Sequence, residues 1–508
     1  MKLSVMIISV SGLILSSNVF SATIRVPSDQ STIQAGIDAA IDGDTVLVAD
    51  GIYTGVGNRD LDFRGQSIAV ASENGAQKCV IYCQLNDDEN HRGFNLDKDQ
   101  SITVIIDGFT IKNACYTQAP SIFEAGGGGI NCDSRSSRLV VSNCLFIDNI
   151  AYRAGGIGTR SSASITNCAF INNSGLRTAG AIYAPCPQLT INKCLFFRNN
   201  AGLNEIDTVA AVVYISNRKG SICDSYFYEN SGGPTARGIC CFSQGDISIS
   251  NCVISKNTFA HYVLCNAPLS YSVRIENCTI AENTTKMATF DNGLLSGMSV
   301  SNCITWNNSP HEFIGANTPV TFSNIRGGYS GVGNICSDPL FRDVESFDYR
   351  LLPESPCIDT GSSEDSPAYD IEGNPRPQGA GVDMGAYEFI FPVTTAFITM
   401  PSHLFKPGDK ASCIGSVWNP HEYGFDEYLF FAVLDIWGTF YCAPSYNMID
   451  YYYLDCNPGL TEIQIMPEFT WPSGVGSVSG IVWYAGLVNP EMTELVSEIG
   501  VFDFGWSE

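Results

Sequence analysis

Few side chains in this sequence have the type and spacing that chemistry requires. Acidic residues and one histidine stand outside the apolar runs at Asp87, Asp107, Glu205, Asp207 and His261. Carboxylates and imidazoles transfer protons in general acid–base catalysis, so these five are the candidate catalytic residues. Two of them also have an ordinary explanation: Asp87 lies in a charged run typical of a solvated turn, and Asp107 precedes a glycine in an Asp-Gly pair typical of a turn.

A second acidic group lies further along the chain and has the chemistry of a cation site. It consists of Asp370, Glu372, Asp383 and Glu388. Calcium prefers such oxygen ligands and is the one cofactor that this group suggests. Capping turns with Arg376 as the counter-charge explain the same residues without a metal, and we favour this structural interpretation.

Six of the 20 cysteines belong to a repeated segment whose basic form is Asn-Cys-apolar-Phe. Seven copies align on Cys144, Cys168, Cys194, Ser225, Cys252, Cys278 and Cys303, at steps of 24, 26, 31, 27, 26 and 25 residues. Five residues after this column every copy has Asn: Asn149, Asn173, Asn199, Asn230, Asn257, Asn283 and Asn308. Small or apolar residues two apart within a copy indicate strands rather than helices. The repeat therefore predicts stacked all-β coils of a solenoid.

In such a stack, equivalent residues of successive coils lie above one another, about 4.8 Å apart. The cysteine column becomes an interior ladder of free thiols, because stacked Cβ atoms point in parallel and make poor disulfide geometry. The pairs Cys79 with Cys83 and Cys442 with Cys456 remain to be checked for disulfides. The Asn column is expected at a bend, in the left-handed conformation, with its amides bonded between coils. Replacing Asn173 or Asn257 with Ala should then cost roughly 1–3 kcal/mol.

A helix over residues 32–41 is predicted to cover the first coil, with Ser31 or Asp29 as its N-cap. The stretch from Thr32 to Tyr53 resembles an opening segment of the pectin-lyase-like β-helix superfamily. The repeats, such as Phe146 to Asn149, resemble those of polymorphic outer-membrane proteins and adhesins. The resemblance covers residues 23 to about 390, and it implies an all-β, right-handed parallel β-helix over residues 22–391.

The resemblance implies fold more than activity. Relatives that cleave polysaccharides use paired carboxylates, or acidic calcium ligands with an Arg or Lys base. The paired-Asp, Gly-His and Arg-x-Pro-x-x-Arg motifs of those enzymes are missing here. We therefore favour a non-catalytic scaffold for adhesion or glycan binding over a polysaccharide lyase or glycoside hydrolase. Opposed carboxylates in a groove, or an acid beside Lys or Arg, would favour the enzyme.

The N-terminus and the charge indicate where the protein acts. Residues 1–21 have the Lys, apolar run and small residues of a cleaved secretory signal peptide, which predicts a secreted or cell-surface protein. No later apolar run is long enough for a membrane-spanning helix. The formal charge of −25 argues against nucleic acid as a partner. A polysaccharide or cell-surface component is the expected partner, and a polyanion would need bound cations or a local basic patch. The sequence leaves the oligomeric state open.

Residues 392–508 lose the repeat and gain aromatic strands separated by Pro and Gly, which predicts a C-terminal β-sandwich domain. Its aromatic residues are expected mainly in the core, and some could form a platform for sugar stacking. These residues are Trp437, Tyr441, Tyr446, Tyr451, Tyr452, Tyr453 and Trp471.

Overall fold

The computed structural model describes residues 21–83, 90–96, 101–118, 125–202, 210–215, 219–234, 236–242, 246–266, 272–291, 297–314, 318–364, 366–390, 394–420, 424–446 and 449–508. The signal-peptide prediction for residues 1–21 lies almost wholly outside them. The chain forms two compact units, one up to Phe389 and one from Ile390.

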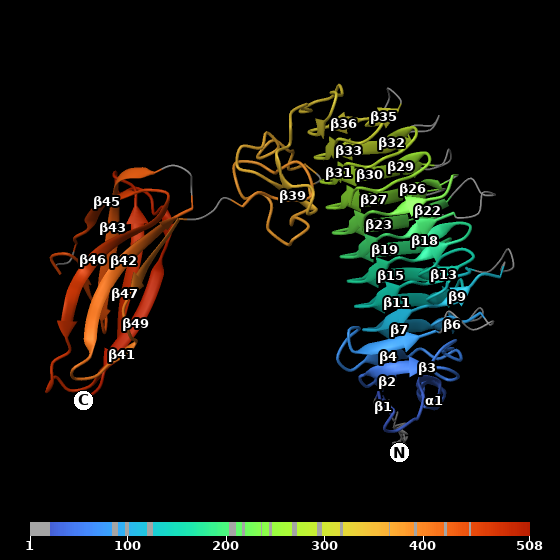
Figure 1. Cartoon of the computed structure of the whole chain (residues 1–508), viewed down its shortest axis with the longest axis horizontal. Helices are drawn as coiled ribbons and strands as arrows, with labels where there is room; N and C mark the ends of the chain where they lie inside the picture. The colour runs from blue at the N-terminus through green and yellow to red at the C-terminus, as the bar shows by residue number, and fades with distance from the viewer. Residues whose placement is uncertain are drawn as a thin grey trace, which may run out of the picture. The chain divides into compact units, whose positions relative to one another are not determined.

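The first unit is a parallel β-helix in which successive coils add one strand to each of several sheets (Figure 1). Sheet 1 has twelve parallel strands. In spatial order they are β1 (Thr23–Val26), β2 (Thr45–Val48), β4 (Ala69–Ser72), β7 (Thr103–Asp107), β11 (Arg138–Ser142), β15 (Ser162–Thr166), β19 (Gln188–Asn192), β23 (Lys219–Cys223), β27 (Asp246–Ser250), β30 (Ser272–Glu276), β33 (Met298–Ser301) and β36 (Val320–Thr321).

Sheet 2 has eleven strands and follows sheet 1 in each coil. They are β3 (Gly51–Thr54), β5 (Cys79–Tyr82), β8 (Thr110–Lys112), β12 (Leu145–Ile147), β16 (Ala169–Ile171), β20 (Leu195–Phe197), β24 (Tyr226–Tyr228), β28 (Val253–Ser255), β31 (Thr279–Ala281), β34 (Ile304–Trp306) and β37 (Asn324–Ile325).

Two further sheets complete the coils. Sheet 3 contains β6 (Phe94–Leu96), β10 (Ile130–Cys132), β14 (Ile157–Thr159), β18 (Ala179–Ala184), β22 (Ala210–Ile215), β26 (Ala236–Phe242), β29 (Tyr262–Asn266), β32 (Ala288–Asp291) and β35 (Phe313–Ile314). The short sheet 4 contains β9 (Cys115–Tyr116), β13 (Ile150–Ala151), β17 (Ser174–Gly175), β21 (Asn200–Ala201) and β25 (Ser231–Gly232).

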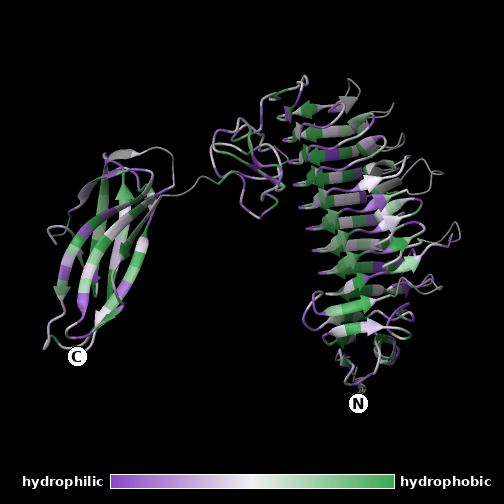
Figure 2. Cartoon of the chain, in the orientation of Figure 1, coloured by the Kyte–Doolittle hydropathy of each residue, from purple (hydrophilic) through white to green (hydrophobic). Residues whose placement is uncertain are grey.

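Strand alternation divides each coil into a core face and a solvent face. In β19, Leu189 and Ile191 are buried, whereas Gln188 is exposed and Thr190 is half-buried. The same alternation recurs in register from strand to strand, so the apolar residues form continuous interior columns (Figure 2). The rings of Phe146, Phe170, Phe196 and Phe227 form one such column, with neighbouring centroids 4.5 to 5.0 Å apart.

The asparagine column forms a continuous interior ladder of amides. The side-chain oxygen of Asn173 accepts from the backbone N and from Nδ2 of Asn149, at 3.2 and 2.9 Å. Its own Nδ2 donates to Asn199 Oδ1 and to Phe146 O, at 3.0 and 2.9 Å. The predicted bonding between coils is therefore confirmed. The predicted left-handed conformation is wrong by one position, since the residue before each ladder Asn adopts it, as Asn172 does at φ 54°.

Glu312 ends the asparagine ladder. The next coil has Gly328 where the repeat would place its Asn, five residues after Ser323. The carboxylate of Glu312 takes that place and accepts from the backbone N and from Nδ2 of Asn308, at 3.1 and 2.7 Å. Glu312 is only 8% exposed, and burial raises its pKa to about 7.

We expect Glu312→Gln to remove one source of pH dependence. The folded pKa of about 7 lies above the ordinary 4.5, so the folded state holds this proton more tightly. The stabilisation that the protonated Glu312 side chain gives the folded state is therefore fully present below about pH 4.5, and it is lost as the pH rises through 7. Gln keeps an acceptor without the charge. In urea denaturation, the unfolding free energy of Glu312→Gln relative to wild type should therefore rise by roughly 2–3 kcal/mol between pH 5 and pH 8. If the difference in unfolding free energy between the variant and wild type is the same at pH 5 and pH 8, the buried carboxylate of Glu312 does not end the ladder as described.

The cysteine column is an interior ladder of free thiols, as predicted. The sulfur of Cys278 accepts from the backbone N of Cys252 at 3.5 Å, and its thiol donates to Glu276 O at 3.3 Å. Ser225 makes the same two kinds of bond where Ser replaces Cys, to Cys194 N at 3.1 Å and Cys223 O at 2.7 Å. The column therefore requires a small side chain that both donates and accepts.

The two cysteine pairs proposed for disulfides remain free. Cys79 and Cys83 point inward along one extended stretch, which puts their Cα atoms about 13 Å apart. Cys442 pairs with Val433 of β43, whereas Cys456 pairs with Phe425 at the other end of that strand. Both separations exceed what a disulfide can span.

Helix α1 (Ile33–Ala39) covers the first coil. Ile33 and Ile37 are fully buried, and α1 contacts β1 and β2. The N-cap is Thr32, whose hydroxyl accepts from Ala35 N at 3.2 Å. The predicted caps Ser31 and Asp29 are therefore wrong, because the helix starts at Ile33, two residues after Ser31 and four after Asp29.

Residues 338–389 fold back against the last coils and contain β38 (Phe341–Asp343) and β39 (Asp348–Leu351). Asn302 exchanges two hydrogen bonds of 2.7 Å with the backbone of Ser362. Ala386 N donates to Thr279 Oγ1 at 3.0 Å. Apolar residues from both sides, among them Val253 and Tyr349, form a common buried cluster. This segment is a lateral cover for sheet 2 at the end of the stack.

The second unit is a β-sandwich. One sheet contains β40 (Thr394–Thr399), β42 (Lys410–Asn419), β46 (Gly459–Thr470) and β48 (Ser497–Glu498). The other contains β41 (Leu404–Phe405), β43 (Phe425–Ile436), β44 (Thr439–Cys442), β45 (Tyr452–Cys456), β47 (Val478–Val488) and β49 (Gly500–Trp506). Their inner faces share a core that includes Cys413, Phe430 and Trp483. Trp471 lies in this core, whereas Trp437 and Tyr453 are each 70% exposed.

Candidate functional site

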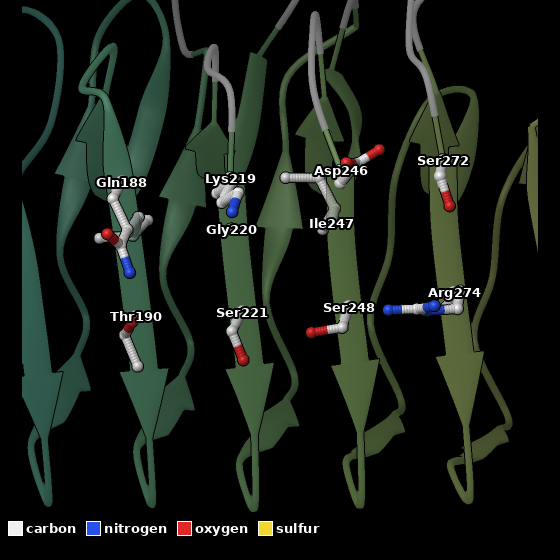
Figure 3. A pocket seen from close by; sticks show the side chains of 11 residues that line it. Gln188, Thr190, Lys219, Gly220, Ser221, Asp246, Ile247, Ser248, Ser272 and Arg274 are labelled. Carbon is white, nitrogen blue, oxygen red and sulfur yellow. The ribbon is translucent and has the colours of Figure 1, made fainter. Parts of the chain in front are cut away.

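A groove on the outer face of sheet 1 is the site with the most varied polar chemistry. It crosses four adjacent strands, β19, β23, β27 and β30. Figure 3 shows two rows of side chains running across these strands. The first row is Gln188, Lys219, Asp246 and Ser272, and the second is Thr190, Ser221, Ser248 and Arg274.

The strand pattern explains why these side chains meet. Each row is one register position of the parallel sheet, so residues 26 to 31 positions apart in sequence lie one strand apart. Buried residues separate the rows, for example Ile247 between Asp246 and Ser248. The alternation that fills the core therefore places the polar residues on the outside, at intervals of about 4.8 Å across strands.

The groove has a volume of about 440 Å³ and combines opposite charges with neutral polar groups. Lys219 and Asp246 are register partners, and Arg274 lies across toward Ser248 (Figure 3). The guanidinium of Arg274 is 3.9 Å from Glu276 and its side chain is 62% exposed. The hydroxyls of Thr190, Ser221 and Ser248 continue the second row. Together they offer donors and acceptors in a regular array.

The groove lining holds fewer acidic groups than the known glycan-cleaving chemistries use. Hydrolysis of a glycosidic bond normally needs two carboxylates on opposite sides of the bond. Asp246 is the single carboxylate among the residues that line the groove. Calcium-assisted elimination needs several acidic ligands. Among the described residues, no group of three or more His, Cys, Asp or Glu side chains is placed to hold a metal.

The structure describes two of the five predicted catalytic residues, and these two lie at different sheets. Asp107 ends β7, where its carboxylate accepts from Ser142 Oγ at 2.6 Å and Asn143 Nδ2 at 2.7 Å, so it fixes the turn between two coils. His261 precedes β29 of sheet 3 and lies beside Tyr262, away from the residues that line the groove. Asp87, Glu205 and Asp207 lie outside the described residues.

Three of the four acids proposed for a cation converge on Arg376. Glu388 pairs with Arg376 at 2.6 Å, and both side chains are 1% exposed. Asp383 accepts from the backbone of Asp359 and Phe389, and Asp370 accepts from that of Glu372 and Asn374. Burial raises the pKa of Asp383 to about 7 and lowers that of Arg376. Protein donors therefore occupy these carboxylates, as the turn-capping alternative proposes.

Glu372 belongs to a different contact. Its carboxylate pairs with Arg350 at 2.8 Å on the surface of the same cover segment. The four acids thus divide into a buried group and a separate exposed ion pair.

The groove itself was not predicted from the sequence. The repeat is most visible in its Asn-Cys segment, whereas the groove residues lie on the preceding strand, just before or between apolar pairs such as Leu189 and Ile191 or Ile247 and Ile249. When those strands are aligned on their buried residues, Lys219 and Asp246 fall in one column.

Comparison with known proteins supports the fold. Residues 209–325 match a family described as "Right handed beta helix region". No curated protein matches the chain. No helix among the described residues is long and apolar enough to cross a membrane.

Proposed function

We propose that this right-handed parallel β-helix repeat protein is an exported scaffold that binds a glycan in the groove on sheet 1, without cleaving it. The signal-peptide pattern of residues 1–21 supports export to the surface or medium. The C-terminal β-sandwich would then extend the binding or docking surface.

The observation that carries this proposal is the pair of polar rows across β19, β23, β27 and β30. A sugar chain presents hydroxyls and ring oxygens at regular intervals, and an in-register parallel sheet presents donors and acceptors at regular intervals too. The hydroxyls and the amide of Gln188 match neutral sugar groups. Lys219 and Arg274 match groups with negative charge.

A polysaccharide lyase is the second candidate function, because an acid lies beside two bases. Asp246 is the register partner of Lys219, and Arg274 belongs to the next strand. Arg or Lys can remove a proton in an elimination reaction. This alternative requires charge stabilisation that a single carboxylate does not provide, so it ranks below binding.

The proposal is tested by titrating neutral and acidic oligosaccharides into the purified protein in a calorimeter. The double variant Lys219→Ser, Arg274→Ser should bind the preferred sugar at least tenfold more weakly, a loss of about 1.4 kcal/mol or more. Both residues lie on the exposed face, so thermal melting should change little.

Arg138→Ser is the matched control. Arg138 occupies the same register column as Gln188, two strands earlier in sheet 1, and is equally exposed. It should leave the affinity within about twofold. Equal losses of affinity in the control and in the double variant would show that the groove is not the sugar-binding site.

A further inference from the structure

A cluster of arginine and tyrosine side chains lies on another face of the coils. It comprises Tyr152, Arg153, Arg177, Tyr183 and Tyr214, which we call the Arg–Tyr cluster. Tyr152 and Arg153 follow β13, Arg177 follows β17, and the other two tyrosines belong to β18 and β22 of sheet 3. All five side chains are half-buried, so each presents part of its surface to solvent.

Stacking fixes the geometry of this cluster. The guanidinium of Arg153 lies 5.2 Å from the ring centre of Tyr183, and Arg177 lies 5.8 Å from that of Tyr152. Tyr183 and Tyr214 stack on adjacent coils with ring centres 5.2 Å apart. Arg153 Nη1 also donates to Tyr183 Oη at 2.8 Å. The planar groups are therefore ordered before any ligand arrives, which lowers the entropic cost of binding.

One more Arg–Tyr contact lies toward the N-terminus. Arg92 lies 3.4 Å from the ring centre of Tyr116, and Tyr152 N donates to Tyr116 O at 2.8 Å. Arg177 N in turn donates to Tyr152 O at 2.8 Å. Tyr116 is the register partner of Ala151, one position before Tyr152, and Arg92 is only 5% exposed, so the contact of Arg92 with Tyr116 lies outside the Arg–Tyr cluster.

The charge of this region opposes that of the whole protein. Residues 125–202 contain seven basic side chains and two acidic ones, whereas the chain has a formal charge of −25. The basic residues are Arg135, Arg138, Arg153, Arg160, Arg177, Lys193 and Arg198, and the acidic ones are Asp133 and Asp148. Arg153 and Arg177 belong to the cluster, whereas Arg138 lies on sheet 1 and Arg198 pairs with Glu229 at 2.6 Å. Screening limits exposed charges to about 8 Å at physiological ionic strength, so a ligand here responds mainly to the two arginines of the cluster.

We infer that the Arg–Tyr cluster binds an anionic polysaccharide chain that carries carboxylate or sulfate groups. Arginine forms paired hydrogen bonds with such oxyanions, and the faces of the tyrosine rings pack against sugar rings. Nε of Arg153 is buried and has no acceptor among the described residues, so the protein does not use every donor of this guanidinium. The inference rests on the proposed glycan-binding function and adds a second surface and a ligand class.

Three probes test this inference with the full-length mature chain at physiological salt: polygalacturonate, dextran sulfate and neutral dextran. Calorimetry should show binding of at least one anionic chain and none of neutral dextran. The relative affinity of the two anionic probes identifies carboxylate or sulfate as the preferred group. The double variant Arg153→Gln, Arg177→Gln should bind the anionic chain at least tenfold more weakly. Tyr214→Leu should weaken binding about threefold without a change in charge.

Two controls make the result decisive. Arg135→Gln with Arg138→Gln removes the same charge from the same segment and should change affinity by no more than about threefold. A loss equal to that of the cluster variant would show unspecific charge attraction and overturn the inference, as would the absence of binding to both anionic chains. The groove variant Lys219→Ser, Arg274→Ser is measured in parallel. If only the cluster variant loses binding of the anionic chain, the cluster stands and the groove does not hold this ligand, which leaves the groove to its own test with neutral sugars; the reverse pattern removes the cluster.

Discussion

Replacing Arg376 with Met is expected to lower the free energy of unfolding of the β-helix unit by about 3–5 kcal/mol. The guanidinium pairs with Glu388 at 2.6 Å in a site where both side chains are 1% exposed. It also donates to Gly385 O at 3.0 Å. Removal would leave the carboxylate of Glu388 buried without its counter-ion. Hydrogen exchange should then show early opening of residues 366–389, alongside a lower denaturation midpoint.

The control is Arg350→Met, which breaks the exposed pair with Glu372. That pair is nearly as short, at 2.8 Å, but its side chains are 45% and 35% exposed. Solvent screening should limit its loss to under about 1 kcal/mol. If the two variants are equally stable, the buried pair does not hold the cover segment on the coils.

Replacing Asn173 with Ala is expected to cost about 3 kcal/mol, the upper end of what the sequence predicts. The substitution leaves three buried groups without their partner: the backbone N–H and Nδ2 of Asn149, and the carbonyl of Phe146. Asn173 is fully buried, so water does not replace these bonds. Urea denaturation followed by circular dichroism measures the loss.

Asn200→Ser is the matched control for the ladder. Asn200 pairs in register with Ser174 and Ser231, so serine already occupies this position in the neighbouring coils. Its side-chain oxygen accepts no hydrogen bond among the described residues. The change should stay within about 0.5 kcal/mol. A loss for Asn173→Ala no larger than this would show that the amide ladder does not stabilise the stack.

The repeat made most of the fold predictable because each interior column has one strict chemical requirement. Only a small side chain that donates and accepts fits at Cys278, and only an amide fits at Asn257, so both columns stand out in the sequence. The left-handed positions tolerate many residues, among them Asp148, Arg198 and Lys256, and so carry no visible signature. Because of that tolerance, the sequence pattern points to the neighbouring Asn as the left-handed residue instead.

The candidate sites were harder to predict because their residues are set by surface chemistry, which varies between coils. Lys219 and Asp246 meet only because a 27-residue coil returns the chain to the same register position. The Arg–Tyr cluster likewise joins residues from three successive coils. The acids near Arg376 were recognised as a group, but burial and hydrogen bonding, which separate Glu372 from Glu388, are not visible in sequence.

The most direct test of the account is to incubate the purified protein with a glycan that it binds, and to measure new reducing ends and unsaturated products. The account predicts saturable binding and no product above the protein-free blank. Product formation that is lost in Asp246→Asn or Arg274→Ser would contradict it and establish a catalytic groove. Loss in a variant of Asp87, Asp107, Glu205, Asp207 or His261 would contradict it equally and place the catalytic site elsewhere on the coils.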